Sequence, residues 1–462
     1  MEKNEMGTGK ISQLLIKFSV PAIIGMLVNA IYNIVDRMFI GNAPHLGSLG
    51  IAGITVSYPV TLILMAVSLM CAVGGATCFS ISLGAKREKD ASIYIGNALT
   101  LAIIFGAVIM IFGNLFINQV LGILGASSNV LPYARSYLSI ILYGAVFSCI
   151  TMCGNNFSRA QGNPKNAMVS QLIGAGFNIA FDYILIFKFN MGMEGAALAT
   201  IGGQFLSMVW QLAFLFSKRC LIPIQFKSMV LKFEHTKKII TTGVPAFLMQ
   251  FSNSILNIIL NGTLVNYGGD IAISTVGIIT SVQTILFMPI TGLTQGQQPL
   301  ISYNFGAKQM SRVKETLKYA IIAASTIAII GFAVIQLLPG FIITAFNKET
   351  DIINLGTNAL RIWFLCLPLI GAQICCANYF QAIGKVREAS ILTLLRQIII
   401  LIPMILILSN LFGLYGIFFA VPIADAASFL ITTLLTYHQM KQIRTEPEET
   451  PKITDEVIEE AQ

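Results

Sequence analysis

The sequence predicts an all-α integral membrane protein, with twelve transmembrane helices in two six-helix lobes related by a pseudo-twofold axis. Three observations predict this fold class: an apolar composition, a one-sided distribution of basic residues and an internal repeat. Of the 462 residues, 55% are hydrophobic and only 11% are charged, and the mean hydropathy is +0.77. Soluble globular domains carry about 25% charged residues. The deficit of charge excludes a soluble enzyme, a nucleic-acid-binding protein and a disordered chain.

Apolar segments fill most of the chain, and a spanning helix needs about 20 such residues. Several segments are longer than that, so we expect these helices to tilt or to kink. The prolines available for kinks are Pro21, Pro59, Pro245, Pro289 and Pro368. The predicted spans are 14–40, 50–82, 93–117, 133–157, 167–188, 194–217, 239–266, 272–303, 317–346, 355–383, 389–410 and 413–437.

Basic residues collect on one side of these spans. Of the 29 Lys and Arg residues, 23 fall in segments on the side of the N-terminus, five lie on or near the other side, and Arg396 lies inside 389–410. Cytoplasmic loops of membrane proteins carry an excess of Lys and Arg. The distribution therefore predicts that both termini are cytoplasmic.

An internal repeat divides the chain in two. The stretch VPAIIGMLVNAIYNIV at 20–35 matches VPAFLMQFSNSILNII at 244–259, and SLGAK at 82–86 matches NFGAK at 304–308. Two halves with an even number of helices start on the same side of the membrane, so their axis lies along the membrane normal. The predicted units are an N-terminal lobe (1–217), a basic cytoplasmic connector (218–238), a C-terminal lobe (239–440) and a disordered acidic tail (441–462).

Three acids lie inside predicted helices, and an ionisable group in a bilayer is a functional candidate because its burial is costly. Asp36 and Asp182 lie toward the outer ends of their helices, and Asn178 precedes Asp182 by one helical turn. Two carboxylates and an amide suit a small cation or a proton. The alternative is that Asp36 pairs with Arg37 and that Asp182 caps a helix end. Asp425, near the middle of the last helix, either lines the second lobe or bonds a neighbouring helix.

Other polar side chains interrupt apolar helices and are candidates for a substrate cavity. Such residues more often join helices than touch a substrate. Methionine can repack around varied apolar ligands. The candidates for the cavity are Asn33, Gln283, Met288, Gln295 and Asp425.

The sequence contains no plausible constellation for catalysis. Its histidines, His45, His235 and His438, are far apart, and there is no Ser/His/Asp grouping, no metal motif and no ATP-binding P-loop. We therefore expect neither an enzyme nor a protein with a bound cofactor. Transport would have to draw on an ion gradient or on the gradient of the substrate itself.

Several motifs together resemble the bacterial multidrug and toxic compound extrusion (MATE) family, in its MepA-like and DinF-like branch within the wider group that includes lipid flippases. The resemblance covers about 1–440. It implies an ion-coupled drug exporter with two six-helix lobes around a central cavity. The motifs are VDRMFIG, SLGAK, NNFSRAQGNP, NIAFDYILIF, GAALAT and GLTQGQQPLISYNFGAK.

The resemblance also implies roles for individual residues. The family's coupling acids fall on Asp36 and Asp182, its amide on Asn178, its threonine on Thr200 and a further polar position near Asn155. Asp36, Asn178, Asp182 and Thr200 would hold Na⁺ if Na⁺ is the coupling ion. The acids that another branch uses in helices 7 and 10 have no clear counterpart here.

The expected function is secondary active efflux of cationic or amphipathic drugs by antiport with Na⁺ or H⁺, through alternating access in which helix 1 bends at Pro21. The alternative is a flippase for a lipid-linked or polyprenyl-linked substrate. Such a cavity needs several cations for pyrophosphate, whereas Arg396 is the one clear intramembrane cation by sequence. We expect a monomer in the bacterial plasma membrane that contacts drugs and lipid and binds no nucleic acid.

Overall fold

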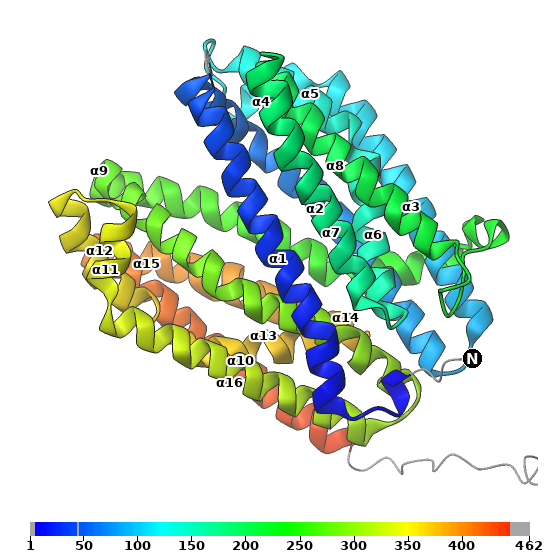
Figure 1. The fold of residues 1–462 in the computed structure, drawn as a ribbon. Coiled ribbons are helices and arrows are strands. Elements are labelled where there is room, and N and C mark those ends of the chain that lie inside the picture. Colours follow the sequence, from blue (N-terminus) through cyan, green and yellow to red (C-terminus); the bar gives the residue numbers. More distant parts are fainter. Residues whose placement is uncertain (1–4, 44–45, 444–462) are drawn as a thin grey trace, which may run out of the picture.

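The structure is a computed structural model that describes residues 5–43 and 46–443, and these residues form helices and no strands. Most of the predicted acidic tail, residues 444–462, lies outside the described residues. Two helical bundles meet at the end where the described chain starts and finishes, and they diverge toward the other end (Figure 1). We call α1 to α8 the first bundle and α9 to α16 the second bundle.

The first bundle begins with a short 3-10 helix, η1, and contains a π-helix, η2, directly after α7. Its elements are η1 (Glu5–Gly7), α1 (Ile11–Asn42), α2 (Gly47–Gly84), α3 (Glu88–Leu115), α4 (Ile117–Ile123), α5 (Leu131–Tyr143), α6 (Ala145–Ala160), α7 (Pro164–Asp182), η2 (Tyr183–Lys188) and α8 (Gly192–Leu215).

The second bundle follows the connector, which holds the 3-10 helix η3 (Phe226–Met229), and it contains a second π-helix, η4. Its elements are α9 (Phe233–Gly306), α10 (Met310–Leu337), α11 (Pro339–Phe346), α12 (Thr350–Trp363), α13 (Leu367–Ala382), α14 (Val386–Leu394), η4 (Leu395–Leu401), α15 (Ile402–Phe412) and α16 (Leu414–Ile443).

The number of spans agrees with the prediction. Among the described residues, nine helices are long and apolar enough to cross a membrane, and the bent pairs α5–α6 (52°) and α12–α13 (49°) qualify as two more. Helix α9 has 74 residues, about 110 Å at 1.5 Å per residue, whereas the hydrocarbon core is about 30 Å thick. Its backbone turns back at Gly269 (φ 57°, ψ −150°), so α9 is two spans and the total is twelve.

The two broken spans were predicted as continuous segments. Pro368 stands in the first turn of α13, where its missing N–H removes no helical bond, and it explains the break before that helix. The break between α5 and α6 falls at Gly144 and has no proline. A Cβ atom on Gly144 would lie 2.4 Å from the Ile201 side chain, so the close approach of α8 requires glycine at this bend.

The bundles touch through backbone contacts that obey the pseudo-twofold symmetry. A Cβ atom on Gly84 would lie 2.0 Å from the Tyr303 carbonyl oxygen, and one on Gly306 would lie 2.0 Å from the Ile81 carbonyl oxygen. Gly84 and Gly306 occupy equivalent places in the repeat, as do Ile81 and Tyr303, so each half offers the same contact to the other. Only glycine permits such an approach of two helices.

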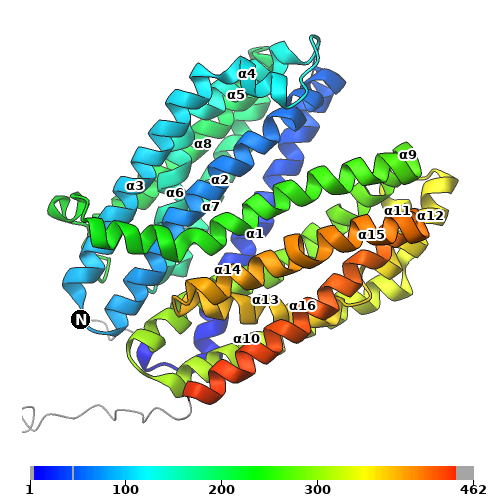
Figure 2. The ribbon, with the colours of Figure 1, turned by 180° about the vertical axis from the view of Figure 1, so that it is seen from behind.

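The start of α1 and the start of α9 each pack into the opposite bundle. Leu14, Leu15 and Phe18 at the start of α1 pack into the core of the second bundle, while Ile40 near its end packs in the first. Ile239 at the start of α9 packs in turn into the core of the first bundle. The first arm of α9 accordingly runs from the foot of the first bundle to the far tip of the second (Figure 2).

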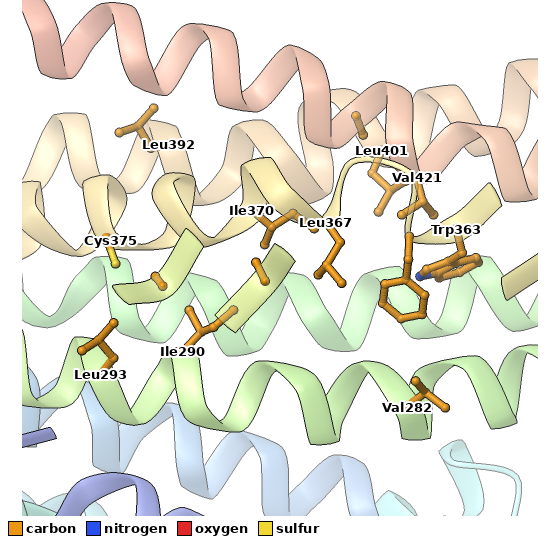
Figure 3. Close-up of a cluster of buried hydrophobic side chains, with 14 of the residues drawn as sticks. Val282, Ile290, Leu293, Trp363, Leu367, Ile370, Cys375, Leu392, Leu401 and Val421 are labelled. Atoms are coloured by element: carbon orange, nitrogen blue, oxygen red, sulfur yellow. The ribbon is translucent and has the colours of Figure 1, made fainter. Parts of the chain in front are cut away.

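The largest apolar core fills the second bundle. Figure 3 shows part of it, where side chains from the second span of α9 lie beside those of α12, α13, α14, η4 and α16. Its labelled members are Val282, Ile290, Leu293, Trp363, Leu367, Ile370, Cys375, Leu392, Leu401 and Val421.

One asparagine attaches the connector to the first bundle. The amide nitrogen of Asn97 on α3 donates to the carbonyl oxygens of Ser228 (2.8 Å) and Val230 (2.9 Å). Its amide oxygen accepts from the backbone N–H of Lys232 (2.8 Å) and from the hydroxyl of Thr236 (3.3 Å). Because a side chain that is fully buried makes four bonds to this segment, the connector is fixed where it leads into α9.

The glycine contacts predict a large effect for a single methyl group. A Cβ atom on Gly74 of α2 would lie 2.1 Å from the Ile239 carbonyl oxygen, so Gly74→Ala should push the bundles apart and cost about 1–3 kcal/mol. Gly277→Ala is the matched control, since nothing lies within 4 Å of its added Cβ and alanine favours a helix. Thermal unfolding of the purified variants should show a lower midpoint for the first alone, and equal midpoints would contradict the proposed contact.

Candidate functional site

Two buried acids of the first bundle meet between α1 and the end of α7. Asp36 is 7% exposed and Asp182 is fully buried. Their carboxyl groups are neighbours, although 146 positions separate them in the sequence. The structure therefore brings together the two acids that the sequence singled out.

The acid pair lacks donors. Four oxygen atoms are buried here without a hydrogen-bond partner in the described structure: one of Asp36, both of Asp182 and the amide oxygen of Asn178. Two carboxylates have no hydrogen to share unless one of them is protonated. A buried cluster of acceptors is costly unless it is compensated, so this geometry calls for a proton or a cation between the oxygens.

Neither the pairing of Asp36 with Arg37 nor a helix cap by Asp182 is found in the described structure. The Arg37 side chain is exposed, and no ion pair joins it to Asp36 within the described residues. Asp182 is followed directly by the π-helix η2, and its side chain makes no capping hydrogen bond. Single π-turns inside helices occur often at functional sites.

The predicted amide and hydroxyl lie beside the acids. Asn178 is a neighbour of the Asp182 carboxyl group, and its amide nitrogen donates to the Thr200 hydroxyl oxygen at 3.3 Å. Thr200 in turn donates to the Ala196 carbonyl oxygen at 3.0 Å, which fixes it on α8. Three helices, α1, α7 and α8, thus supply four oxygen-bearing side chains to one place.

Asn155 belongs to the same region through a shared cavity. Its oxygen accepts a hydrogen bond of 2.7 Å from the amide of Gln211, which also accepts from Ser158 (2.6 Å) and Asn166 (3.0 Å). The cavity has a volume of about 150 Å³, enough for several water molecules and below the size of a typical drug pocket. Its polar lining is Asn29, Tyr32, Ser148, Thr151, Asn155, Gln171, Asn178, Thr200, Gln204 and Ser207.

Sequence reasoning missed two tyrosines at the site. Tyr32 on α1 and the buried Tyr137 on α5 both lie within electrostatic range of Asp36 and Asp182. Thirteen tyrosines are spread over the chain, so residue type alone does not single these two out. The one usable signal is that Tyr32 stands one helical turn before Asp36.

The five predicted cavity residues do not gather in one place. The Asn33 amide donates to the Asn29 carbonyl oxygen of its own helix at 2.7 Å, and Gln283 accepts from the Trp363 indole at 3.3 Å. Gln295 lines a small cavity between the bundles. Met288 is half-buried on α9 and lines neither this cavity nor the larger one within the described residues.

Asp425 bonds a neighbouring helix, which was one of its two predicted roles. The Arg396 guanidinium donates to it at 2.7 Å, and the two side chains are 19% and 2% exposed. Arg396 belongs to the π-helix η4 and lies 5.9 Å from the centre of the Phe287 ring. The one intramembrane cation that the sequence identified is therefore neutralised within the second bundle.

Among the described residues, no group of three or more His, Cys, Asp or Glu side chains could hold a metal ion. The acid pair supplies two such side chains, and its further oxygen atoms come from an amide and a hydroxyl. The site of two carboxylates, an amide and a hydroxyl offers oxygen atoms only, which suit a hard cation or a proton.

Comparison with known proteins agrees with the fold. The MatE family profile matches residues 21–184 and 245–407, which are equivalent parts of the two halves. The multidrug export protein MepA of Staphylococcus aureus strain MSSA476 is 30% identical over 425 residues, covering 92% of this chain and 93% of that protein. MepA of Staphylococcus haemolyticus is 29% identical over 427 residues, with the same coverage.

Solved structures share this architecture. The MATE multidrug transporter DinF-BH, solved as a complex, is 35% identical, with a TM-score of 0.90 over 96% of this chain and 100% of that one. A MATE family transporter in an outward-facing conformation has a TM-score of 0.90 at 23% identity, covering 96% and 99% of the two chains, and supports the fold alone.

These matches confirm the fold class and the family resemblance that the sequence predicted. The pattern of apolar helices fits a protein that crosses the membrane many times. With two thirds of its length matched by the family profile and a relative 30% identical over most of both chains, the protein belongs to the MatE family.

Proposed function

We propose that the protein is a secondary active multidrug efflux transporter that exports cationic or amphipathic drugs in exchange for Na⁺ or H⁺. Its family, the relatives named multidrug export protein MepA and the similarity to the multidrug transporter DinF-BH support the drug-export part. The observation that carries the coupling part is the acid pair of Asp36 and Asp182, whose buried oxygens have no donor in the described structure.

The coupling site works through charge. Two neighbouring carboxylates in a low-dielectric environment repel each other, and a bound proton or Na⁺ removes that repulsion. Asn178 and Thr200 supply further oxygen ligands for a cation. Asn178 and Thr200 also line the cavity of the first bundle, so an ion at the acids and a cationic drug in this bundle would compete for the same negative charge.

Helix α1 transmits the state of the site to the rest of the molecule. Phe18 packs in the second bundle, whereas Gly25 packs against Gln171 of the first, so α1 passes from one bundle to the other between these residues. Pro21 lies within this stretch and interrupts the helical hydrogen bonds, which allows α1 to bend. An ion at Asp36 would thereby change how the bundles lie relative to each other.

A flippase for lipid-linked sugars is less well supported. Its cavity would need unpaired cations for pyrophosphate, and Arg396 is paired with Asp425. A second buried cation, Arg159, faces a cavity of only about 10 Å³, which is too small for pyrophosphate. The basic site that a phosphate-bearing lipid requires therefore has no support in the described residues.

The remaining parts of the proposal concern the setting. The protein would work as a monomer in the bacterial plasma membrane, with both termini in the cytoplasm and lipid around its apolar surface. It would catalyse no chemical reaction and would need no cofactor besides its coupling ion. The measurement that decides between ions is transport in vesicles with a Na⁺ gradient and a pH gradient imposed separately.

The acid pair predicts that Asp182→Asn abolishes coupled export while expression stays normal, because the amide removes the charge that attracts the ion. The measurement is ethidium retention by cells that express each variant, with and without collapse of the ion gradients. Asp425→Asn is the matched control and should have a smaller effect, since that carboxylate pairs with Arg396. Full export by Asp182→Asn would remove the assigned site, and a larger effect at Asp425 would move it to the second bundle.

Competition between ion and drug predicts a salt and pH dependence of drug binding. Drug affinity of the purified protein should fall as Na⁺ rises if Na⁺ is the coupling ion, or as the pH drops if it is H⁺. The dependence should vanish in the Asp36→Asn, Asp182→Asn double variant, in which the amides supply their own hydrogens. Fluorescence titrations with ethidium can test this, and wild-type affinity that ignores both ions would contradict competition in the first bundle.

A further inference from the structure

A small cavity lies between the two bundles, apart from the acid pair. Its walls come from α2 and α6 of the first bundle and from the second span of α9. Its volume is about 10 Å³, about the space that one water molecule needs. The polar groups that line it include Ser80, Asn156, Arg159 and Gln298. None of these residues belongs to the proposed coupling site.

The cavity contains a buried positive charge without a counter-charge. Arg159 is 4% exposed, and its Nη1 atom has no hydrogen-bond partner in the described structure. No carboxylate pairs with it in the part of the chain that the structure describes. The hydroxyl of Ser80, which is 1% exposed, is also without a partner. An unpaired buried charge is strongly destabilising, so this arrangement needs a partner.

The second half of the chain provides an internal comparison. Ser302 is equivalent to Ser80, and its hydroxyl donates to the Ala382 carbonyl oxygen at 2.7 Å. The equivalent acceptor for Ser80 would be the carbonyl of Ala160, which lines the cavity, yet Ser80 makes no such bond. Gln381, a neutral side chain whose Nε2 atom is also buried without a partner, stands where the first half has Arg159. The two halves thus differ in that the first has a charged side chain at this position and an unpaired serine hydroxyl beside it.

We propose that this cavity binds a small monovalent anion, chloride being the most abundant, between the Arg159 guanidinium and the Ser80 hydroxyl. A water molecule would fill the space and accept hydrogen bonds, but it would leave the charge uncompensated. A single negative charge neutralises the guanidinium and accepts hydrogen bonds from both groups. Because the walls come from both bundles, the anion stabilises the arrangement in which they meet at this end.

The test is the anion dependence of thermal stability in purified protein, at constant Na⁺ concentration so that the coupling site is unaffected. Chloride and bromide should raise the unfolding midpoint over gluconate in a saturating manner. Arg159→Gln, which introduces the residue of the other half, should lose this dependence. Arg135→Gln, which removes an exposed guanidinium from α5, is the matched control and should keep it.

Three outcomes would overturn the proposal. The first is equal stabilisation of wild type and Arg159→Gln by chloride. The second is an order in which sulfate and fluoride stabilise more than chloride, as expected for exclusion from the surface. The third is crystallographic: bromide should give an anomalous peak within hydrogen-bonding distance of Arg159, and water alone there would contradict a bound anion. The crystallographic arm needs only wild-type protein, so it decides even if Arg159→Gln does not fold. Neither measurement involves transport, so they do not depend on the proposed drug export.

Discussion

The close crossing of α2 with α9 is the constraint on which the rest of the structure depends. Helix α2 meets the first span of α9 at Gly74 and the second span at Gly84, so closely that backbone atoms of α9 occupy the space of a Cβ atom on α2. In a membrane, lipid is as apolar as the helix surface, so helices associate by close packing and not by escape from water. The glycines create that packing at the end where the bundles meet, and the other ends diverge from it.

Helix α1 links the region of the acid pair to both bundles. The first arms of α1 and α9 each pack in the opposite bundle, so neither bundle can rotate without moving an arm of the other. Asp36 lies on the later part of α1, which packs in the first bundle, and Asp182 lies at the end of α7 in the same bundle. A change in the interaction between the two carboxylates would therefore act within the first bundle, and α1 connects that bundle to the second through its first residues.

The sequence predicted most of the fold and the meeting of the acids, because charges are so rare in apolar helices that each one stands out. Asp36, Asp182 and Asn178 could be assigned to one depth from helical spacing alone, although their role in coupling stays a prediction. The tyrosine at 137 and the pairing of Asp425 with Arg396 could not be predicted, since both depend on how separate helices face each other. The predicted span 133–157 ends before Arg159, whereas in the structure α6 continues to Ala160 and the arginine is buried.

The reciprocal contact of Gly84 and Gly306 has the form of an isologous interface, the kind that joins two copies of one subunit about a twofold axis. Covalent fusion of the halves removes the requirement that such copies be identical. Equivalent surfaces keep the same glycines, which geometry demands on both sides. The interiors have diverged: one half contains a pair of acids without donors, and the other contains an arginine that neutralises its acid. In a fused pair, one half can thus contain the uncompensated acids, while the other half provides the equivalent surface against which it packs.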